Sequence, residues 1–211
     1  MARKAAKQKN ALPTFEIIFE NSFRLKGELY PGLAPNAAGR FADLANRGYY
    51  DGSVIKLMAP GGIIVIDQLE RTEADCIPGE FLLNGCTYNT GRVCAGSLCF
   101  YHDTHYDSGS TGFFVVLTSA SRTVRMVEGA FALFGQVLEG LQLAEMLSRT
   151  GCDENGNPTV YHRIKSVRVE TNGRELPYET CPEPESPIGR LVMGEETDDE
   201  PIVDESSPFI N

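Results

Sequence analysis

The chain has 211 residues, of which 42% are hydrophobic, so it is long enough to bury the core of one compact domain. Its formal net charge of −10 argues against nucleic-acid binding, which needs clustered lysine and arginine. No apolar run reaches the length of a membrane span. The basic start, MARKAAKQKN, lacks the apolar segment of a secretory signal. We therefore expect a cytoplasmic protein without nucleic-acid or membrane partners.

The first part of the chain predicts a hairpin and then a helix. Residues 14–20 and 23–30 are rich in β-formers and are separated by a short polar turn. A helix is expected over residues 36–47, because Pro35 precedes it and apolar residues recur at helical spacing. The apolar face of that helix consists of Phe41, Leu44 and Ala45.

The rest of the chain predicts more strands and one more helix. That helix is expected over residues 139–149, and the link 67–95 is expected to be an irregular surface loop. Eight short strands with two helices favour a mainly β protein, a closed eight-stranded antiparallel barrel capped by two α-helices. The remaining strand candidates are 54–58, 62–66, 96–100, 112–117, 130–137 and 160–170.

Charge divides the chain into a domain and two tails. Residues 1–13 form a basic N-terminal tail, residues 14–178 the barrel domain, and residues 179–211 an acidic tail. The acidic tail contains ten acidic residues against one basic residue, Arg190. Because a polar, like-charged segment buries little apolar surface, residues 180–211 are expected to be mostly disordered. Such a tail is a candidate docking segment for a basic protein.

Three stretches carry a family resemblance. ELYPGLAPNAAGRFADLANRGYYDG (residues 28–52) keeps an E-L-Y-P…A-P…F…L…G-Y-Y-D-G frame, and IPGEFLLNG (77–85) is similar to I-K-G-E-F-x-x-N-G. Residues 108–140 keep the glycines and Phe134 of G-S-Q-F-F-I…F-G-x-V-x-x-G. The chain thus resembles the cyclophilin family of peptidyl-prolyl isomerases, as a divergent, bacterial-type single-domain member. This resemblance implies an eight-stranded barrel that isomerises X–Pro bonds of peptides or protein clients and needs no cofactor or metal.

The departures from the family pattern gather in the implied peptide groove. Leu57 stands where the family has its catalytic arginine, and Val65 stands where it has a glutamine. The tryptophan and histidine of the groove rim become Met126 and Phe131, whereas Phe113 is taken as the retained pocket phenylalanine. The resemblance implies a groove lined by Ile63, Val65, Tyr101, His102, Thr111, Phe113, Met126, Val127 and Phe131.

These departures bear on the reaction. Rotation about X–Pro has a barrier of about 18–20 kcal/mol, and the family's arginine donates a hydrogen bond to the twisted amide. Leucine has no donor, so Leu57 is expected to be catalytically non-functional and the activity to be weak. Arg122 and Arg125 are candidates to replace the missing arginine. The alternative is a peptide- or protein-binding module or scaffold without turnover.

Two further patterns leave alternatives open. The six cysteines contain no Cys-x-x-Cys and are expected to be free thiols, although Cys86, Cys94 and Cys99 are close enough in sequence for a redox pair. CFYHDTHYD, residues 99–107, contains cysteine, histidine and aspartate at spacings that suit a metal. A loop at the rim of the groove explains the same pattern, and no metal site is expected.

Overall fold

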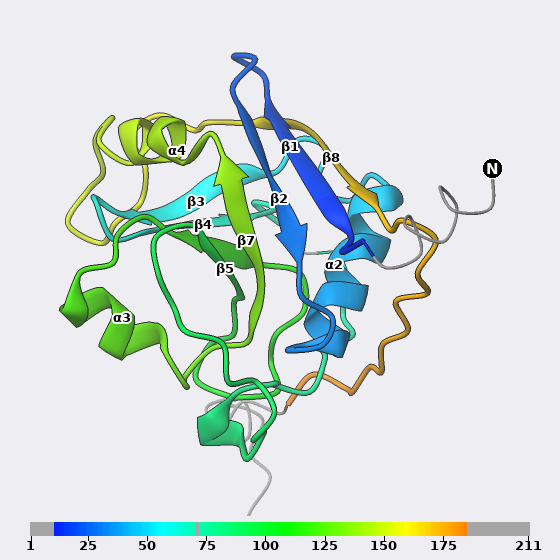
Figure 1. Ribbon diagram of the computed structural model, residues 1–211. Helices are drawn as coiled ribbons and strands as arrows, with labels where there is room; N and C mark the ends of the chain where they lie inside the picture. Colours follow the sequence, from blue (N-terminus) through cyan, green and yellow to red (C-terminus); the bar gives the residue numbers. More distant parts are fainter. Residues whose placement is uncertain (1–10, 71, 185–211) are drawn as a thin grey trace, which may run out of the picture.

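The computed structural model describes residues 11–70 and 72–184 (Figure 1). The prediction of a disordered acidic tail concerns mainly residues 185–211 and so lies outside the described residues, as does most of the basic N-terminal tail. In chain order the elements are β1 (Thr14–Phe19), β2 (Arg24–Leu29), α2 (Pro35–Asn46), β3 (Val54–Ala59), β4 (Ile63–Asp67), the 3-10 helix η1 (Leu82–Asn84), β5 (Ser97–Phe100), β6 (Phe113–Val116), α3 (Ser121–Val127), β7 (Leu133–Glu139), α4 (Leu141–Leu147) and β8 (Ile164–Glu170).

The eight strands form one antiparallel sheet, so the predicted mainly β fold is confirmed. Their order is β3-β4-β6-β5-β7-β2-β1-β8. The sheet curls into a half-barrel, whose edge strands β3 and β8 meet at a seam with the isolated bridge Val54–Arg163. Backbone hydrogen bonds on either side of this bridge, from Ile164 N to Ser53 O (2.7 Å) and from Ile55 N to His162 O (3.1 Å), extend the seam. Closure is therefore local, whereas the sequence predicted a fully closed barrel.

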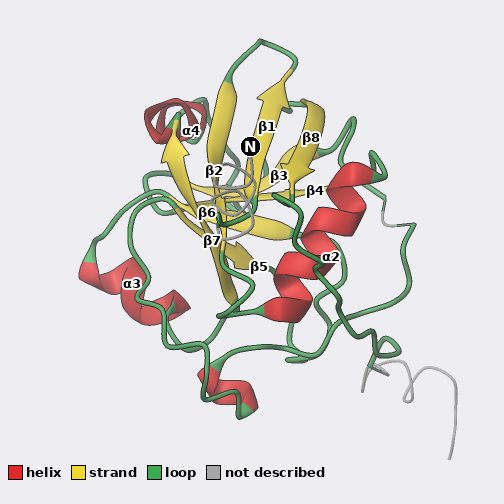
Figure 2. Ribbon diagram, turned by 45° about the vertical axis from the view of Figure 1, so that its right-hand side comes forward, coloured by secondary structure: helices red, strands yellow, loops and turns green. Residues whose placement is uncertain are grey.

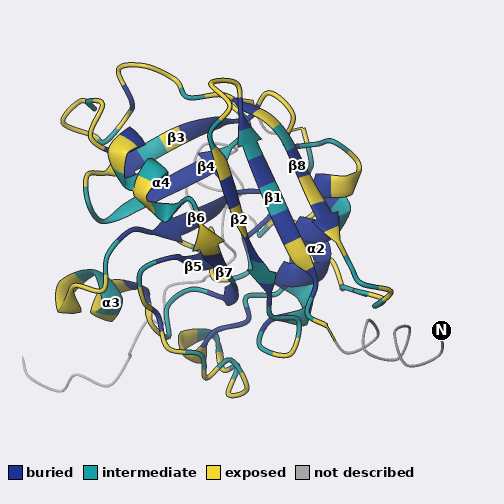
Figure 3. Ribbon diagram, turned by 45° about the horizontal axis from the view of Figure 1, so that its top comes forward, coloured by how far each residue is buried: buried dark blue, intermediate teal, exposed yellow. Residues whose placement is uncertain are grey.

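The core fills the inside of the half-barrel and lies under α2. Alternate residues of each strand point inward, as the period of a strand requires, and are buried (Figure 3). Phe41 of α2 contacts the rings of Phe15, Tyr50, Phe113 and Phe134 at centroid distances of 5.1–6.0 Å. Helices α2 and α4 lie at opposite ends of the half-barrel, as Figures 1 and 2 show. The two predicted helices are confirmed: α2 begins and ends one residue earlier than expected, and α4 is shorter than the expected 139–149.

The helix α3, residues Ser121–Val127, was not predicted. Its sequence, SRTVRMV, brings only Val124 and Val127 onto one helical face, which is too weak a period to separate from a turn. Two strands also begin later than expected, β7 at Leu133 and β8 at Ile164.

The link between β4 and β5 is irregular, as predicted, but a buried carboxylate holds it in place. Glu80 is buried, and its two oxygens accept hydrogen bonds from the backbone N–H groups of Asn36 (3.0 Å) and Ala37 (2.9 Å). These groups belong to the first turn of α2, where backbone donors lack partners within the helix. Burial raises the pKa of Glu80, although the two backbone hydrogen bonds lower it in part. Glu80 thus fastens the link to the helix.

Within the part of the chain that the structure describes, no helix combines the length and the apolar character needed to cross a lipid bilayer.

Candidate functional site

Five strands place one apolar side chain each in a row on the outer face of the half-barrel. The pairing registers set Leu57 opposite Val65, Val65 opposite Phe114, Phe114 opposite Cys99, and Cys99 opposite Leu133. Residues directly opposite in an antiparallel pair point to the same face. We call these five residues the apolar row. All belong to or pack against one apolar cluster, separate from the inner core.

The neighbouring residues of the same strands point inward. Ile66 pairs with Phe113, and Phe113 pairs with Phe100, and all three belong to the inner core. Phe113 is fully buried against Phe41 and Tyr50, so the prediction that it lines the groove is wrong. The reason is parity: the family pattern G-S-Q-F-F becomes G-S-T-G-F-F here, and one extra residue moves the outward position to Phe114.

The apolar row is partly covered. Val124 and Val127 of α3 pack on it, as do Ile63 and Phe131. Of these four residues, Ile63, Val127 and Phe131 were predicted to line the groove, whereas Val124 was not. Val65 is 4% exposed and Phe114 only 1%. The row therefore offers an incoming side chain little open surface beyond Leu57 and the edges of Ile63 and Phe131.

A stack of rings meets the row at its middle residue, Phe114. The His102 ring lies between Phe81 (centroids 4.8 Å apart, planes at 7°) and Phe131 (4.5 Å, 30°). Phe131 in turn meets Phe114 edge-on at 5.0 Å. The two ring nitrogens of His102 lie 2.8 Å from the carbonyl oxygens of Asp103 and Ala130. Since carbonyl oxygens only accept, the tautomer of the ring decides which of these contacts is a hydrogen bond.

Beyond the stack lies a polar hollow of about 290 Å³. Its lining includes the predicted residues Tyr101, His102 and Thr111 together with Lys56 and Glu183. The Thr111 hydroxyl donates to the carboxylate of Asp67 (2.8 Å), and the backbone carbonyl of Thr111 accepts from the hydroxyl of Tyr50 (2.8 Å). The hollow therefore presents polar groups next to the apolar row.

Asp103 sits at the rim of this polar hollow. Burial raises the pKa of Asp103, but hydrogen bonds from the Ser108 hydroxyl (2.6 Å) and the His105 backbone (3.0 Å) outweigh burial and leave the pKa lowered. The rim of the hollow is thus negatively charged at neutral pH.

The structure does not bring the remaining candidates to the row. Met126 is 66% exposed on α3, and the side chains of Arg122 and Arg125 are exposed on the same helix. Positions 122 and 125 are three residues apart and share a helical face, which differs from the face that contains Val124 and Val127. Neither arginine is placed beside Leu57.

The metal alternative for CFYHDTHYD finds no support in the geometry. Cys99 is buried in the apolar row, and burial raises its pKa far above the usual range of a thiol. Asp107 accepts a hydrogen bond from the backbone of Gly79 (2.8 Å). Over residues 11–70 and 72–184, no group of three or more potential ligands is positioned to hold a metal ion.

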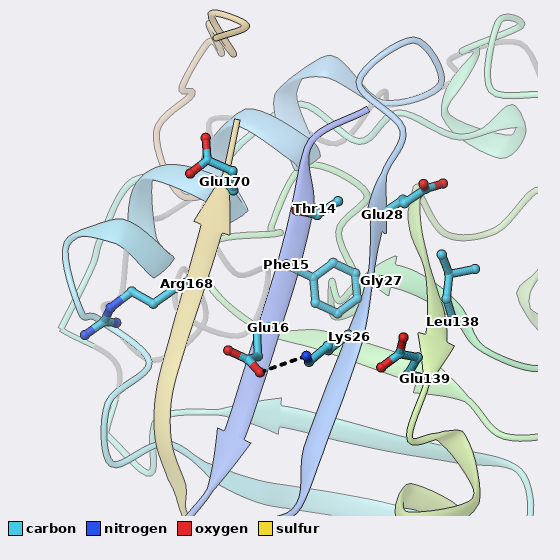
Figure 4. A pocket seen from close by; sticks show the side chains of 10 residues that line it. All are labelled: Thr14, Phe15, Glu16, Lys26, Gly27, Glu28, Leu138, Glu139, Arg168 and Glu170. Atoms are coloured by element: carbon cyan, nitrogen blue, oxygen red, sulfur yellow. Dashed lines mark ion pairs between the residues drawn. The ribbon is translucent and has the colours of Figure 1, made fainter. Parts of the chain in front are cut away.

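A second, larger hollow of about 470 Å³ lies on the outer face of β8, β1, β2 and β7 (Figure 4). The charged side chains around it include Glu16 and Lys26, whose Oε1 and Nζ atoms are 3.5 Å apart, as well as Arg168 and Glu170. None of the predicted groove residues lines it.

Phe114, Leu133 and Val124 are among the residues of the candidate site that sequence reasoning missed. Counting the alternation of inward and outward residues along Phe113–Val116 identifies Phe114, once the extra Gly112 is taken into account. The other two carry no local signal, because Leu133 is placed by pairing with the distant strand β5 and Val124 by the packing of α3 on the row.

Comparisons with known proteins point to one family. Among protein families, the one described as cyclophilin type peptidyl-prolyl cis-trans isomerase/CLD matches residues 14–169. Peptidyl-prolyl cis-trans isomerase B of Bacillus subtilis is 29% identical over 159 residues, 75% of this chain and 99% of that protein. Peptidyl-prolyl cis-trans isomerase-like 1 of Aspergillus oryzae is 25% identical over 150 residues, 70% of this chain and 90% of that protein.

Solved structures show the same fold. A crystal structure of a Cryptosporidium parvum cyclophilin type peptidyl-prolyl cis-trans isomerase aligns with a TM-score of 0.61 and 18% identity, covering 76% of this chain and 98% of that one. The structure of that protein in the presence of the dipeptide Ala-Pro aligns with the same TM-score and 19% identity, covering 74% of this chain and 98% of that one.

Proposed function

Because the chain belongs to the cyclophilin-type peptidyl-prolyl cis-trans isomerase family, we propose that it binds proline-containing segments at the apolar row and isomerises their X–Pro bonds only weakly. The observation that carries this proposal is the pairing of Leu57 with Val65. These are the positions at which the family resemblance implies an arginine and a glutamine. Here the two facing side chains are both hydrocarbons.

The reaction needs little apart from a hydrogen-bond donor. The barrier of about 18–20 kcal/mol comes from amide resonance, and a donor aimed at the amide nitrogen stabilises the twisted state. Removing one preorganised donor from an enzyme lowers its rate by about 10²–10³-fold. Since neither Leu57 nor Val65 has a donor, we infer a loss of at least this size.

Nearby polar groups are engaged in the structure. The ring nitrogens of His102 face two carbonyl oxygens, and the Thr111 hydroxyl donates to Asp67. Lys56 is exposed, and its Nζ contacts the carbonyl oxygen of Gln68 at 3.4 Å, at the polar hollow and not over the row. Bringing one of these donors to the amide would require giving up an existing contact.

A second candidate function is binding without turnover, and exposed apolar side chains favour it. Leu82 (60% exposed) and Leu83 (61%) of η1 lie beside the end of α3, where the backbone of Leu83 donates to Gly129 O (2.9 Å). Met126 of α3 is also exposed. We call Leu82, Leu83 and Met126 the apolar lip. A surface of this kind suits an apolar client segment better than a single proline ring.

The two functions are separated by measuring binding and turnover on one sample. A tetrapeptide containing Ala-Pro is titrated into ¹⁵N-labelled protein, and its cis–trans exchange is measured by NMR. We expect shifts at the backbone amides of Leu57, Tyr101 and Phe131, with exchange about 100-fold slower or more than with the Bacillus subtilis relative at equal concentration.

The outcomes are distinct. Exchange as fast as with the relative would refute the weak-isomerase proposal. Shifts without measurable exchange would favour the second candidate. A Leu83→Ser, Met126→Ser variant should lose binding if the apolar lip holds the client, and should keep it if the apolar row does. A sample that shows no amide shifts and no exchange would contradict both functions.

A further inference from the structure

Two cysteines far apart in the sequence face each other across an isolated antiparallel bridge. The backbone N–H of Cys76 donates to the carbonyl of Cys181 (2.9 Å), and the N–H of Cys181 donates to the carbonyl of Cys76 (2.8 Å). More than a hundred residues separate them in the chain. Cys76 begins the link that contains Glu80, and Cys181 lies on the segment that follows β8.

The bridge positions the two side chains for a covalent bond. A reciprocal pair of hydrogen bonds sets two residues directly opposite, with Cα atoms about 5.5 Å apart and side chains on one face. Disulfides span Cα separations of about 4.4–6.8 Å. The Cβ atoms of a disulfide are about 3.8 Å apart, whereas those of a hydrogen-bonded pair are about 5.5 Å apart, so closing the bond draws the two Cβ atoms together by roughly 1.5–2 Å. The bridge lies outside the eight-stranded sheet, so no ladder has to deform.

The surroundings indicate which sulfur meets an oxidant first. Cys76 is fully buried, whereas Cys181 is half-buried, with its Sγ 3.7 Å from the carbonyl oxygen of Asp107. Burial raises the pKa of the Cys181 thiol, and the negative charges of Asp107 and Asp75 raise it further. The thiolate of Cys181 is therefore scarce at neutral pH, and its reaction is slow.

We propose that Cys76 and Cys181 are a redox-sensitive pair that forms an intramolecular disulfide by exchange with a low-molecular-weight disulfide such as oxidised glutathione. The Cys181 thiolate attacks one sulfur of glutathione disulfide, whose S–S bond breaks and releases one glutathione thiolate. The Cys76 sulfur, after losing its proton, then attacks Sγ of Cys181 and displaces the second glutathione. The protein loses two electrons and two protons, and two reduced glutathione molecules are released.

The disulfide would join the start of the C-terminal segment covalently to the link between β4 and β5, which contains Glu80. Glu183, two residues after Cys181, lines the polar hollow beside the apolar row. Oxidation therefore fastens a wall of that hollow covalently to the rest of the domain. Closing a loop of about a hundred residues also restricts the unfolded chain, so the melting temperature should rise by about 5–10 °C.

Peptide mapping tests the pairing. Full-length protein is incubated with oxidised glutathione, capped with iodoacetamide and digested with trypsin. The expected product joins residues 72–92 to residues 175–190, and dithiothreitol should separate the two. Because residues 72–92 also contain Cys86, the experiment is repeated with Cys86→Ser, which should still give the linked product.

The controls are also set by the structure. Cys94 is exposed and should take up glutathione as a mixed disulfide, so a Cys94→Ser background removes that signal. Cys181→Ser should abolish both the linked peptide and the rise in melting temperature. The proposal would be overturned if the Cys86→Ser variant gave no linked peptide, or if glutathione stayed on Cys181 without a bond to Cys76. Formation of the Cys76–Cys181 disulfide without a change in melting temperature would refute the proposal that it holds the C-terminal segment to the rest of the domain.

Discussion

Restoring the missing donor is the sharpest test of the weak-isomerase proposal. Leu57 and Val65 are directly opposite in β3 and β4, so the double variant Leu57→Arg, Val65→Gln sets a guanidinium beside an amide that can hold it. The arginine would emerge from a half-buried position at the edge of the apolar row, with its head toward the groove. We expect this double variant to gain isomerase activity.

The size of the gain follows from the value of one donor. A preorganised donor contributes about 10²–10³ in rate, or roughly 3–4 kcal/mol. Val65 is almost fully buried, so glutamine there places a polar amide in an apolar cluster at a cost of about 1–3 kcal/mol in stability. We therefore expect a partial recovery of about 10–100-fold and a lower melting temperature. Leu57→Arg alone should gain less, because its guanidinium lacks a neighbour to orient it.

Exchange spectroscopy on an Ala-Pro peptide measures this gain, and the amide spectrum of each variant shows whether it is folded. Leu57→Met with Val65→Gln is the matched control, since methionine has similar length and no strong donor. Leu57→Ala should leave the low rate nearly unchanged. Wild-type turnover comparable to that of the Bacillus subtilis relative would refute the reasoning, as would a folded double variant with no gain over the methionine control.

Three further predictions concern stability and are measured by urea or thermal unfolding. Glu80→Ala should destabilise the protein by about 2–4 kcal/mol, since it leaves both N–H groups at the start of α2 without their acceptors, whereas Glu80→Gln should cost less, about 1–2 kcal/mol, since its amide oxygen can still accept from one of them; equal losses would contradict the account. Burial lowers the pKa of His162, so the unfolded chain binds a proton there more readily; stability should fall as the pH drops through the unfolded value near 6.5, and His162→Asn should remove that part of the slope. Gly27→Ala should destabilise by about 3 kcal/mol, because its Cβ would collide with the carbonyl of Gln136, whereas Gly32→Ala, which meets nothing within 4 Å, should be neutral.

The architecture was readable from the sequence because it rests on local periods. The alternation of Phe15, Ile17 and Phe19 in β1, and the helical spacing of Phe41 and Leu44 in α2, both point at the buried core. These patterns can be read without knowing how distant segments of the chain pair. The same reasoning put Leu57 and Val65 in two successive strands, and the structure pairs these strands so that the two residues lie opposite each other.

The errors came from features that local periods do not contain. One extra residue, Gly112, inverted the parity of β6 and exchanged Phe113 for Phe114. The pairing of Cys76 with Cys181 joins segments with no common local pattern. The sequence showed Glu80 only as part of a motif, because its role requires the first turn of α2 to lie beside it.

The position of β1 between β2 and β8 has a consequence for how the chain folds. Thr14 pairs with Glu28 on one side and with Glu170 on the other, so one partner is adjacent in sequence and the other is nearly the whole domain away. During synthesis, β1 and β2 can form their hairpin early, but the free edge of β1 stays unpaired until the last strand has been made. Non-local pairing of this kind slows folding. The nascent domain is therefore most exposed to edge-to-edge association just before β8 arrives.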